Sequence, residues 1–239
     1  VAATITQKSL TESGLSVAAS RAYDGTTAAS VSGTAALLAS ETAGSGTTSD
    51  GKPYTGDTVS ITGTAVGTYN DAHVANATTV TFSGLSLTGA QAGNYSLTIQ
   101  SPASATITAA TLTPTITNTG VTKVYDGTTS SSITPTYSFT GLVSGDTAAT
   151  LTNTGIAYNY KDVATATLVT VSGLSISSIT GNKSSVAGDY ALSATSKTVA
   201  ATITQKSLTE SGLSVAASRA YDGTTAASVS GTAALLASE

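Results

Sequence analysis

Apolar and polar residues alternate with a period of two along much of this chain. Val80 and Phe82 flank a Thr, Leu85 and Leu87 flank a Ser, and the same pattern recurs at 95–99. Alternation over about four to eight residues, bounded by Gly or Asn, is typical of half-buried antiparallel strands. No long stretch has helical spacing, so the pattern predicts an all-β protein with roughly six or seven short strands per hundred residues.

Two sheets packed face to face are a common arrangement for many short alternating strands. We therefore predict tandem antiparallel β-sandwich units of the immunoglobulin-like kind in an extended rod, with β-grasp-like units as the alternative. The composition agrees, because 40% of the residues are hydrophobic, only 9% are charged, and Ser and Thr supply about a third of the chain. Such a chain is not typical of a disordered segment or of a cytosolic enzyme, whose charged fraction is about a quarter.

Internal repetition sets the organisation of the chain. Residues 1–41 are identical to residues 199–239, and a diverged copy lies between them. The word Tyr-Asp-Gly-Thr-Thr begins at Tyr23, Tyr125 and Tyr221, which are 102 and 96 residues apart. Each of these tyrosines lies 20 residues after the first residue of an ATIT segment. Two related repeats therefore alternate, and we call them repeat A and repeat B.

These landmarks predict the division of the chain. We expect the last strand of a preceding repeat at 1–7, repeat A at 8–109, repeat B at 110–205, and the first third of a following repeat A at 206–239. Neither Gly nor Pro separates successive repeats, which favours a stiff connection. A third of a β-domain would leave apolar side chains and strand edges bare, so we expect neighbouring copies or a longer fibre to complete it. Repeat A has an insertion near 42–54, where Gly, Ser and Thr predict a surface loop.

Charge and cysteine content narrow the class of protein. The net charge is −4, and no window gathers the Lys or Arg that a nucleic-acid backbone would require. No apolar run approaches the roughly 20 residues of a membrane-spanning helix. The chain has no Cys, which excludes disulfides and thiol chemistry and is compatible with export of a long unfolded chain.

Several words occur in a fixed order, namely KVYDGTT, GDT, TVSGLSI, AGNYSLTI and the closing ATIT. Together they resemble the YDG and MBG-type repeat modules of large bacterial surface adhesins, including filamentous-haemagglutinin-like secreted proteins. The resemblance covers essentially the whole chain and implies a tandem β-domain stalk on or outside the cell, with roles in adhesion, biofilm or matrix. It implies no catalytic residues. Repeat A departs from the usual pattern at Asp71-Ala72-His73, where repeat B keeps Lys161.

Candidates for catalysis are few. Acid–base catalysis needs a base with a partner in reach, and the chain has a single His. His73 aligns with Asp162, so the repeats do not share it, and we interpret it as a surface-loop residue. Residues 46–52 imitate a phosphate-binding loop, but Pro53 stands where a Ser or Thr should bind magnesium. We predict that the protein is not an enzyme and uses no cofactor.

Aspartate recurs at fixed places in the YDG words and in the GDT words. Calcium prefers about six to eight oxygen ligands from clustered carboxylates, whereas these single Asp residues are followed by Gly or Thr, which is typical of turns. We therefore predict that these Asp residues form turns. Calcium binding is the alternative, and its candidate ligands are Asp24, Asp126, Asp57 and Asp146. We predict one turn at each joint between repeats, formed by the Tyr, Asp and Gly of a YDG word. The three turns are Tyr23, Asp24 and Gly25; Tyr125, Asp126 and Gly127; and Tyr221, Asp222 and Gly223.

The function predicted from these features is mechanical. We expect a stalk or fibre segment of a bacterial cell-surface or secreted adhesin, located outside the cell, which supports adhesion, biofilm or matrix through end-to-end and lateral β-domain assembly. The expected partners are other copies or neighbouring repeats of the same chain; we expect no nucleic acid as a partner and no membrane span in this segment. The alternative is a module that binds polysaccharide or matrix glycan in every repeat. Three glycosylation sequons, at Asn76, Asn94 and Asn182, are expected by chance in a chain so rich in Ser and Thr.

Overall fold

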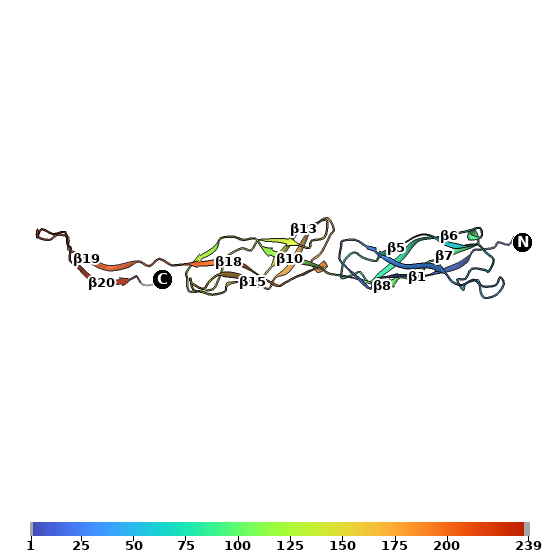
Figure 1. The fold of residues 1–239 in the computed structure, drawn as a ribbon, viewed down its shortest axis with the longest axis horizontal. Coiled ribbons are helices and arrows are strands. Elements are labelled where there is room, and N and C mark those ends of the chain that lie inside the picture. The colour runs from blue at the N-terminus through green and yellow to red at the C-terminus, as the bar shows by residue number, and fades with distance from the viewer. Residues whose placement is uncertain (1, 237–239) are drawn as a thin grey trace. The chain divides into compact units, whose positions relative to one another are not determined.

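The computed structural model describes residues 2–236, and nearly all of its regular structure is β (Figure 1). Besides its strands, this part of the chain contains two 3-10 turns, η1 (Ala92–Asn94) and η2 (Ala187–Asp189), and no α-helix. Neither turn has the length or hydrophobicity that a helix needs to cross a membrane. The all-β prediction is therefore confirmed.

Contacts between residues divide the chain into two compact units. The first contains the residues up to 115 together with 137–154 and 172–197, and the second contains 116–136, 155–171 and the residues from 198 on. Predicted repeat B therefore contributes to both units, while predicted repeat A lies wholly in the first. Among the described residues, 2–7 form no strand, whereas the identical ATIT segment at 201–204 belongs to a strand. Val1 and residues 237–239 of the predicted end segments lie outside the described residues.

Repeat A forms three sheets in the first compact unit, and Figure 1 shows β5 and β6 as its long central strands. The four-stranded sheet has the order β3 (Ala28–Ala29), β5 (Ser60–Tyr69), β6 (Thr79–Thr88) and β8 (Ala103–Ser104). The three-stranded sheet has the order β4 (Val31–Leu37), β1 (Lys8–Val17) and β7 (Tyr95–Thr98). The third sheet pairs β2 (Ser20–Ala22) with β9 (Thr106–Thr108).

Two sheets from repeat B complete the first compact unit. One has the order β12 (Tyr137–Thr140), β10 (Ala110–Ile116) and β17 (Tyr190–Leu192). The other pairs β13 (Asp146–Thr152) with β16 (Ser175–Gly181). Only Ala109 separates β9 from β10, so the chain passes from one repeat to the next without a flexible linker.

The second compact unit contains one larger sheet and one hairpin. The larger sheet has the order β11 (Val121–Val124), β18 (Ser196–Thr204), β15 (Leu168–Ser172) and β14 (Gly155–Tyr158). The hairpin pairs β19 (Glu210–Val215) with β20 (Val229–Leu235).

Parallel pairing is the main departure from the expected sheets. The prediction of antiparallel strands holds for the hairpins but misses four parallel pairs, β1–β7, β2–β9, β10–β17 and β11–β18. Side chains alternate between the two faces of a strand in either orientation, so a period of two does not reveal the direction of the partner. Each parallel pair joins strands that lie far apart in the sequence, for example Lys8 with Tyr95 and Val121 with Ala201.

One hydrophobic core includes residues of both repeats. Repeat A supplies Tyr23, Tyr69, Val80 and Ile107 among others, and repeat B supplies Leu112 and Tyr190. Val80 and Leu112 are completely buried, and burial of such side chains contributes about 1.5–3 kcal/mol each. A separate core of the second compact unit gathers around Val169 and Tyr158. Since the first core spans the repeat boundary, the end of repeat A is packed only when repeat B follows it.

The identical segments of the chain have different environments. Leu10 and Tyr23 are 0% and 3% exposed, whereas their counterparts Leu208 and Tyr221 are 67% and 98% exposed. The hairpins β1–β4 and β19–β20 nevertheless share one register and one bulge, at Gly14 in the first and Gly212 in the second. The hairpin is thus encoded locally, while burial requires the remaining strands of the repeat.

Glycine is required at the bulge of this hairpin. Gly14 has a φ of 102°, and a Cβ placed there would lie 2.4 Å from the carbonyl oxygen of Thr34. Any other residue would therefore be strained both by its backbone conformation and by this contact.

Candidate functional site at the joint between repeats

The Asp of each YDG word accepts hydrogen bonds from its own turn. Asp24 Oδ1 accepts from the backbone N–H and the hydroxyl of Thr26, both at 2.8 Å. Asp126 makes the same pair of contacts with Thr128 at 2.9 Å. Asp222 repeats them with Thr224 at 3.0 and 2.9 Å. The middle residue of each word, Gly25, Gly127 or Gly223, has a φ between 73° and 77°.

A basic residue three positions before each Asp completes this turn. Arg21 lies 2.6 Å from Asp24, Lys123 lies 2.7 Å from Asp126, and Arg219 pairs with Asp222. Hydrogen bonds from the Lys123 ammonium and from Thr128 lower the pKa of Asp126 to about 2. Because the ionised carboxylate is the form that accepts these bonds, each turn favours a charged Asp.

The Asp of each GDT word accepts a hydrogen bond from a tyrosine of its own repeat. The Tyr95 hydroxyl donates to Asp57 Oδ2 at 2.5 Å and accepts from the N–H of Tyr54 at 3.0 Å. The Tyr190 hydroxyl donates to Asp146 Oδ2 at 2.5 Å and accepts from the N–H of Val143 at 3.0 Å. Burial, and then the hydrogen bond to Asp146, raise the pKa of Tyr190 to about 12.

This Tyr–Asp pair was not predicted from the sequence. The sequence nevertheless contains a pattern that could have revealed the pair, because the Asp of GDT and the Tyr of AGNY or AGDY recur in both repeats. Within residues 2–236, no three His, Cys, Asp or Glu side chains gather in a group that could hold a metal ion. Each of the four calcium candidates accepts hydrogen bonds from the protein instead.

Tyr23 connects the end of repeat A to repeat B. Its ring is 5.7 Å from that of Tyr190 in an edge-on arrangement and stacks on the His73 ring at 6.3 Å. Its hydroxyl lies 2.7 Å from the Ser185 hydroxyl, which donates to Asp146 at 2.6 Å. The predicted joint residue therefore lies in the shared core, in contact with the Tyr–Asp pair of the next repeat.

Asp189 is the second connection across this joint. The side chain is completely buried and accepts hydrogen bonds from His73 Nδ1 at 2.8 Å, from the N–H of Val74 at 3.0 Å and from the N–H of Val186 at 2.9 Å. A buried carboxylate is stable only when donors of this kind replace water. His73, interpreted from the sequence as a surface-loop residue, is thus a partner of the buried Asp189, and its side chain is 26% exposed.

The insertion of repeat A is held to β1 by ion pairs. Lys8 Nζ lies 2.5 Å from Glu41 Oε1, 3.0 Å from Asp50 Oδ1 and 4.2 Å from the centre of the Tyr54 ring. Burial lowers the pKa of Lys8, but the two carboxylates raise it more, so the ammonium form is strongly favoured. Lys52 of the phosphate-loop imitation is exposed and uses its backbone N–H to donate to Asp50 Oδ1 at 3.1 Å.

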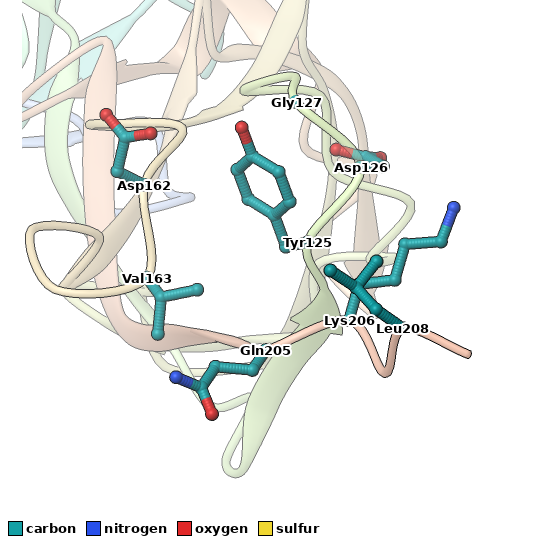
Figure 2. Close-up of a pocket in the computed structure, with 8 residues that line it drawn as sticks. All are labelled: Tyr125, Asp126, Gly127, Asp162, Val163, Gln205, Lys206 and Leu208. Carbon is teal, nitrogen blue, oxygen red and sulfur yellow. The ribbon is translucent and has the colours of Figure 1, made fainter. Parts of the chain in front are cut away.

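A cavity of about 770 Å³ lies at the corresponding end of repeat B, inside the second compact unit. Figure 2 shows the ring of Tyr125 beside the loop that carries Asp162 and Val163, with Lys206 and Leu208 on the other side. Tyr125 is half-buried, between the extremes of Tyr23 and Tyr221. The three YDG tyrosines therefore occupy the same position of the repeat but differ in solvent exposure, from buried Tyr23 through half-buried Tyr125 to exposed Tyr221.

The fold and this joint define a tandem-repeat β-protein in which repeat A and repeat B share a core. The YDG domain profile matches residues 6–105 and again residues 108–198, so the chain belongs to the YDG domain family. No match was found to a curated protein or to a solved structure.

Proposed function

We propose that this chain is a structural segment, a stalk or fibre, of a bacterial cell-surface or secreted adhesin. The observation that carries the proposal is the core that continues from repeat A into repeat B through Tyr23, Tyr190 and Asp189. A shared core makes the orientation of one repeat depend on the next, as a support requires.

The family supports a repeat module, since the YDG domain is matched twice in tandem. The resemblance of its words to those of bacterial adhesins adds the location outside the cell and the role in adhesion, biofilm or matrix. In this proposal the recurring chemistry of each repeat is structural: its Asp and Tyr side chains hold turns and joints, and the protein needs neither catalysis nor a cofactor.

Surface labelling tests the location. Antibodies raised against the purified chain should label intact cells that produce the parent protein, and brief protease treatment of those cells should remove the signal. Labelling only after lysis would overturn the proposal.

Shortening the array tests the mechanical role. Removal of one repeat A and one repeat B from the parent should reduce adhesion in proportion to the lost length while leaving the adhesive specificity unchanged. A complete loss of binding to one particular surface would instead favour a dedicated binding module.

Glycan binding is the alternative, and the cavity beside Tyr125 of repeat B is the observation that favours it. The corresponding position in repeat A is filled by Tyr190 and Ser185, so that cavity does not recur in repeat A. A glycan array probed with the full chain should give no signal if the repeats are purely structural.

A further inference from the structure

The same joint surface occurs twice in this chain, once filled and once open. In repeat A, residues Tyr23, His73 and Val74 contact repeat B. In repeat B, the equivalent residues Tyr125, Asp162 and Val163 line the cavity of Figure 2. We call these last three residues the B face.

Hydrogen bonds establish that the two loops are equivalent. The carbonyl of His73 accepts from the N–H groups of Asn76 and Ala77 at 3.2 and 3.0 Å. The carbonyl of Asp162 accepts from the N–H groups of Thr165 and Ala166 at 3.1 and 2.9 Å. Asp162 therefore occupies the position of His73, and Val163 that of Val74.

The other half of the joint also occurs twice. Turn η2 carries the buried Asp189 and is followed by Tyr190, and turn η1 carries Asn94 and is followed by Tyr95. Both tyrosines donate to a GDT aspartate and begin a strand that pairs in parallel with the first strand of their repeat. Asn94, however, is exposed, and the η1 end of repeat A is met only by Gln7, whose Nε2 donates to the Gly93 carbonyl at 3.1 Å, among the hydrogen bonds of the described residues that join it to a side chain.

We propose that the B face binds the η1 end of repeat A in a second copy of this chain, with Asn94 opposite Asp162. The inference rests on the structural role proposed above and names its partner. In the filled joint, the carboxylate of Asp189 on turn η2 accepts hydrogen bonds from the Val74 N–H and from His73 Nδ1. Asn94 matches the open joint, because its carbonyl oxygen can accept from the Val163 N–H while its amide donates to the Asp162 carboxylate.

This pairing makes the joints selective. The joint face of repeat A carries His73, which forms a hydrogen bond with Asp189 of repeat B. The joint face of repeat B carries Asp162, whose carboxylate lies 3.3 Å from Lys161 Nζ at the surface. The Asp189 position of another repeat B would therefore bring two carboxylates together in a buried site. Like charges forced together exclude a wrong partner. One side chain on each face therefore favours the alternation of A and B.

Sequence identity lets the second copy fit without new pairings at β7. Lys206–Thr209 repeats the sequence of Lys8–Thr11, the part of β1 that pairs with β7. When the B face meets the η1 end of a second copy, β7 of that second copy can pair with its own Lys8–Thr11 or with Lys206–Thr209 of the first copy. Since the two segments are identical, either one pairs with β7 equally well, and the free energy of association comes from the joint itself.

Cross-linking tests the predicted contact, since the natural chain contains no Cys. Full-length Asn94→Cys and Asp162→Cys proteins of different size are mixed and oxidised, and mixed disulfide dimers should exceed their statistical share. Ser83→Cys, at an exposed position on β6, replaces Asn94→Cys as the control and should give only the statistical share. Equal yields from Asn94→Cys and Ser83→Cys would overturn the proposal.

A charge exchange tests the selectivity in the Cys-free protein. Sedimentation velocity should show concentration-dependent self-association that Asn94→Asp weakens about tenfold or more, and that the double variant Asn94→Asp with Asp162→His restores. Both positions are exposed, so circular dichroism should confirm an unchanged fold. A neutral effect of Asn94→Asp, or no recovery in the double variant, would refute the proposed pair. Neither result depends on where the parent protein is located, so surface labelling remains an independent test of the function.

Discussion

Replacement of Leu10 by Ala should lower the free energy of unfolding of the first compact unit by about 2–5 kcal/mol. Leu10 is completely buried in β1, where it pairs with Leu97 of β7 and lies beside Gly51 of the insertion. Shortening this side chain removes its transfer free energy and leaves a cavity that the strands on both sides cannot close.

The chain contains its own control for this substitution. Leu208 has the same neighbours in sequence but is 67% exposed, so Leu208→Ala should change the free energy of unfolding by no more than about 0.5 kcal/mol. Effects on the unfolded chain are nearly the same at the two sites, because the surrounding residues are identical. The difference between the two variants therefore isolates the contribution of tertiary packing.

Urea unfolding, followed by circular dichroism and by tyrosine fluorescence, measures both variants. With a slope of about 2 kcal/mol per molar urea, a loss of about 3 kcal/mol moves the midpoint of the first compact unit down by about 1.5 M. Equal shifts for Leu10→Ala and Leu208→Ala would refute the reasoning, because they would mean that the two copies of the segment are packed alike.

Three further variants test buried polar groups of the first compact unit. Glu12 is completely buried, and its carboxylate is poorly satisfied, because Oε2 accepts one hydrogen bond at 3.2 Å and Oε1 has no partner. Glu12→Gln should therefore raise the melting temperature, whereas the same change at its exposed counterpart Glu210 should leave it unchanged. The raised pKa of Tyr190 stabilises the fold below pH 10, and this contribution of about 3 kcal/mol should disappear between pH 10 and about 12. Urea unfolding across that range should show the decline, and Tyr190→Phe should make it smaller, leaving the part that comes from other tyrosines with a raised pKa, such as Tyr23 and Tyr95. His73→Ala should cost about 2–4 kcal/mol in urea unfolding, and Asp189→Asn in that variant should restore part of it, whereas a loss below about 0.5 kcal/mol would contradict the pairing.

The strands and the turns were predictable because their causes are local. Burial alternates along β6, where Val80 and Phe82 are buried between exposed or half-buried Thr and Ser residues, as a period of two requires. The YDG turn depends on residues within five positions of one another, so its Asp and Gly could be assigned to a turn without knowledge of the fold.

The joint was not predictable in detail because its contacts are long-range. His73 and Asp189 are 116 residues apart, and Tyr23 and Ser185 are 162 residues apart. The ion pairs of Lys8 with the insertion were missed for the same reason, since the pattern of the insertion indicates only a surface loop. The recurring words align the positions of both repeats but do not show which of these positions meet.

The shared hairpin also has a genetic consequence. Unequal crossing-over between the two identical stretches would insert or delete 198 residues, and the exchange point would always fall within the same 41-residue segment. Such an event adds or removes one repeat A and one repeat B together. A lineage could therefore vary the length of this protein from generation to generation without ever placing two B repeats side by side.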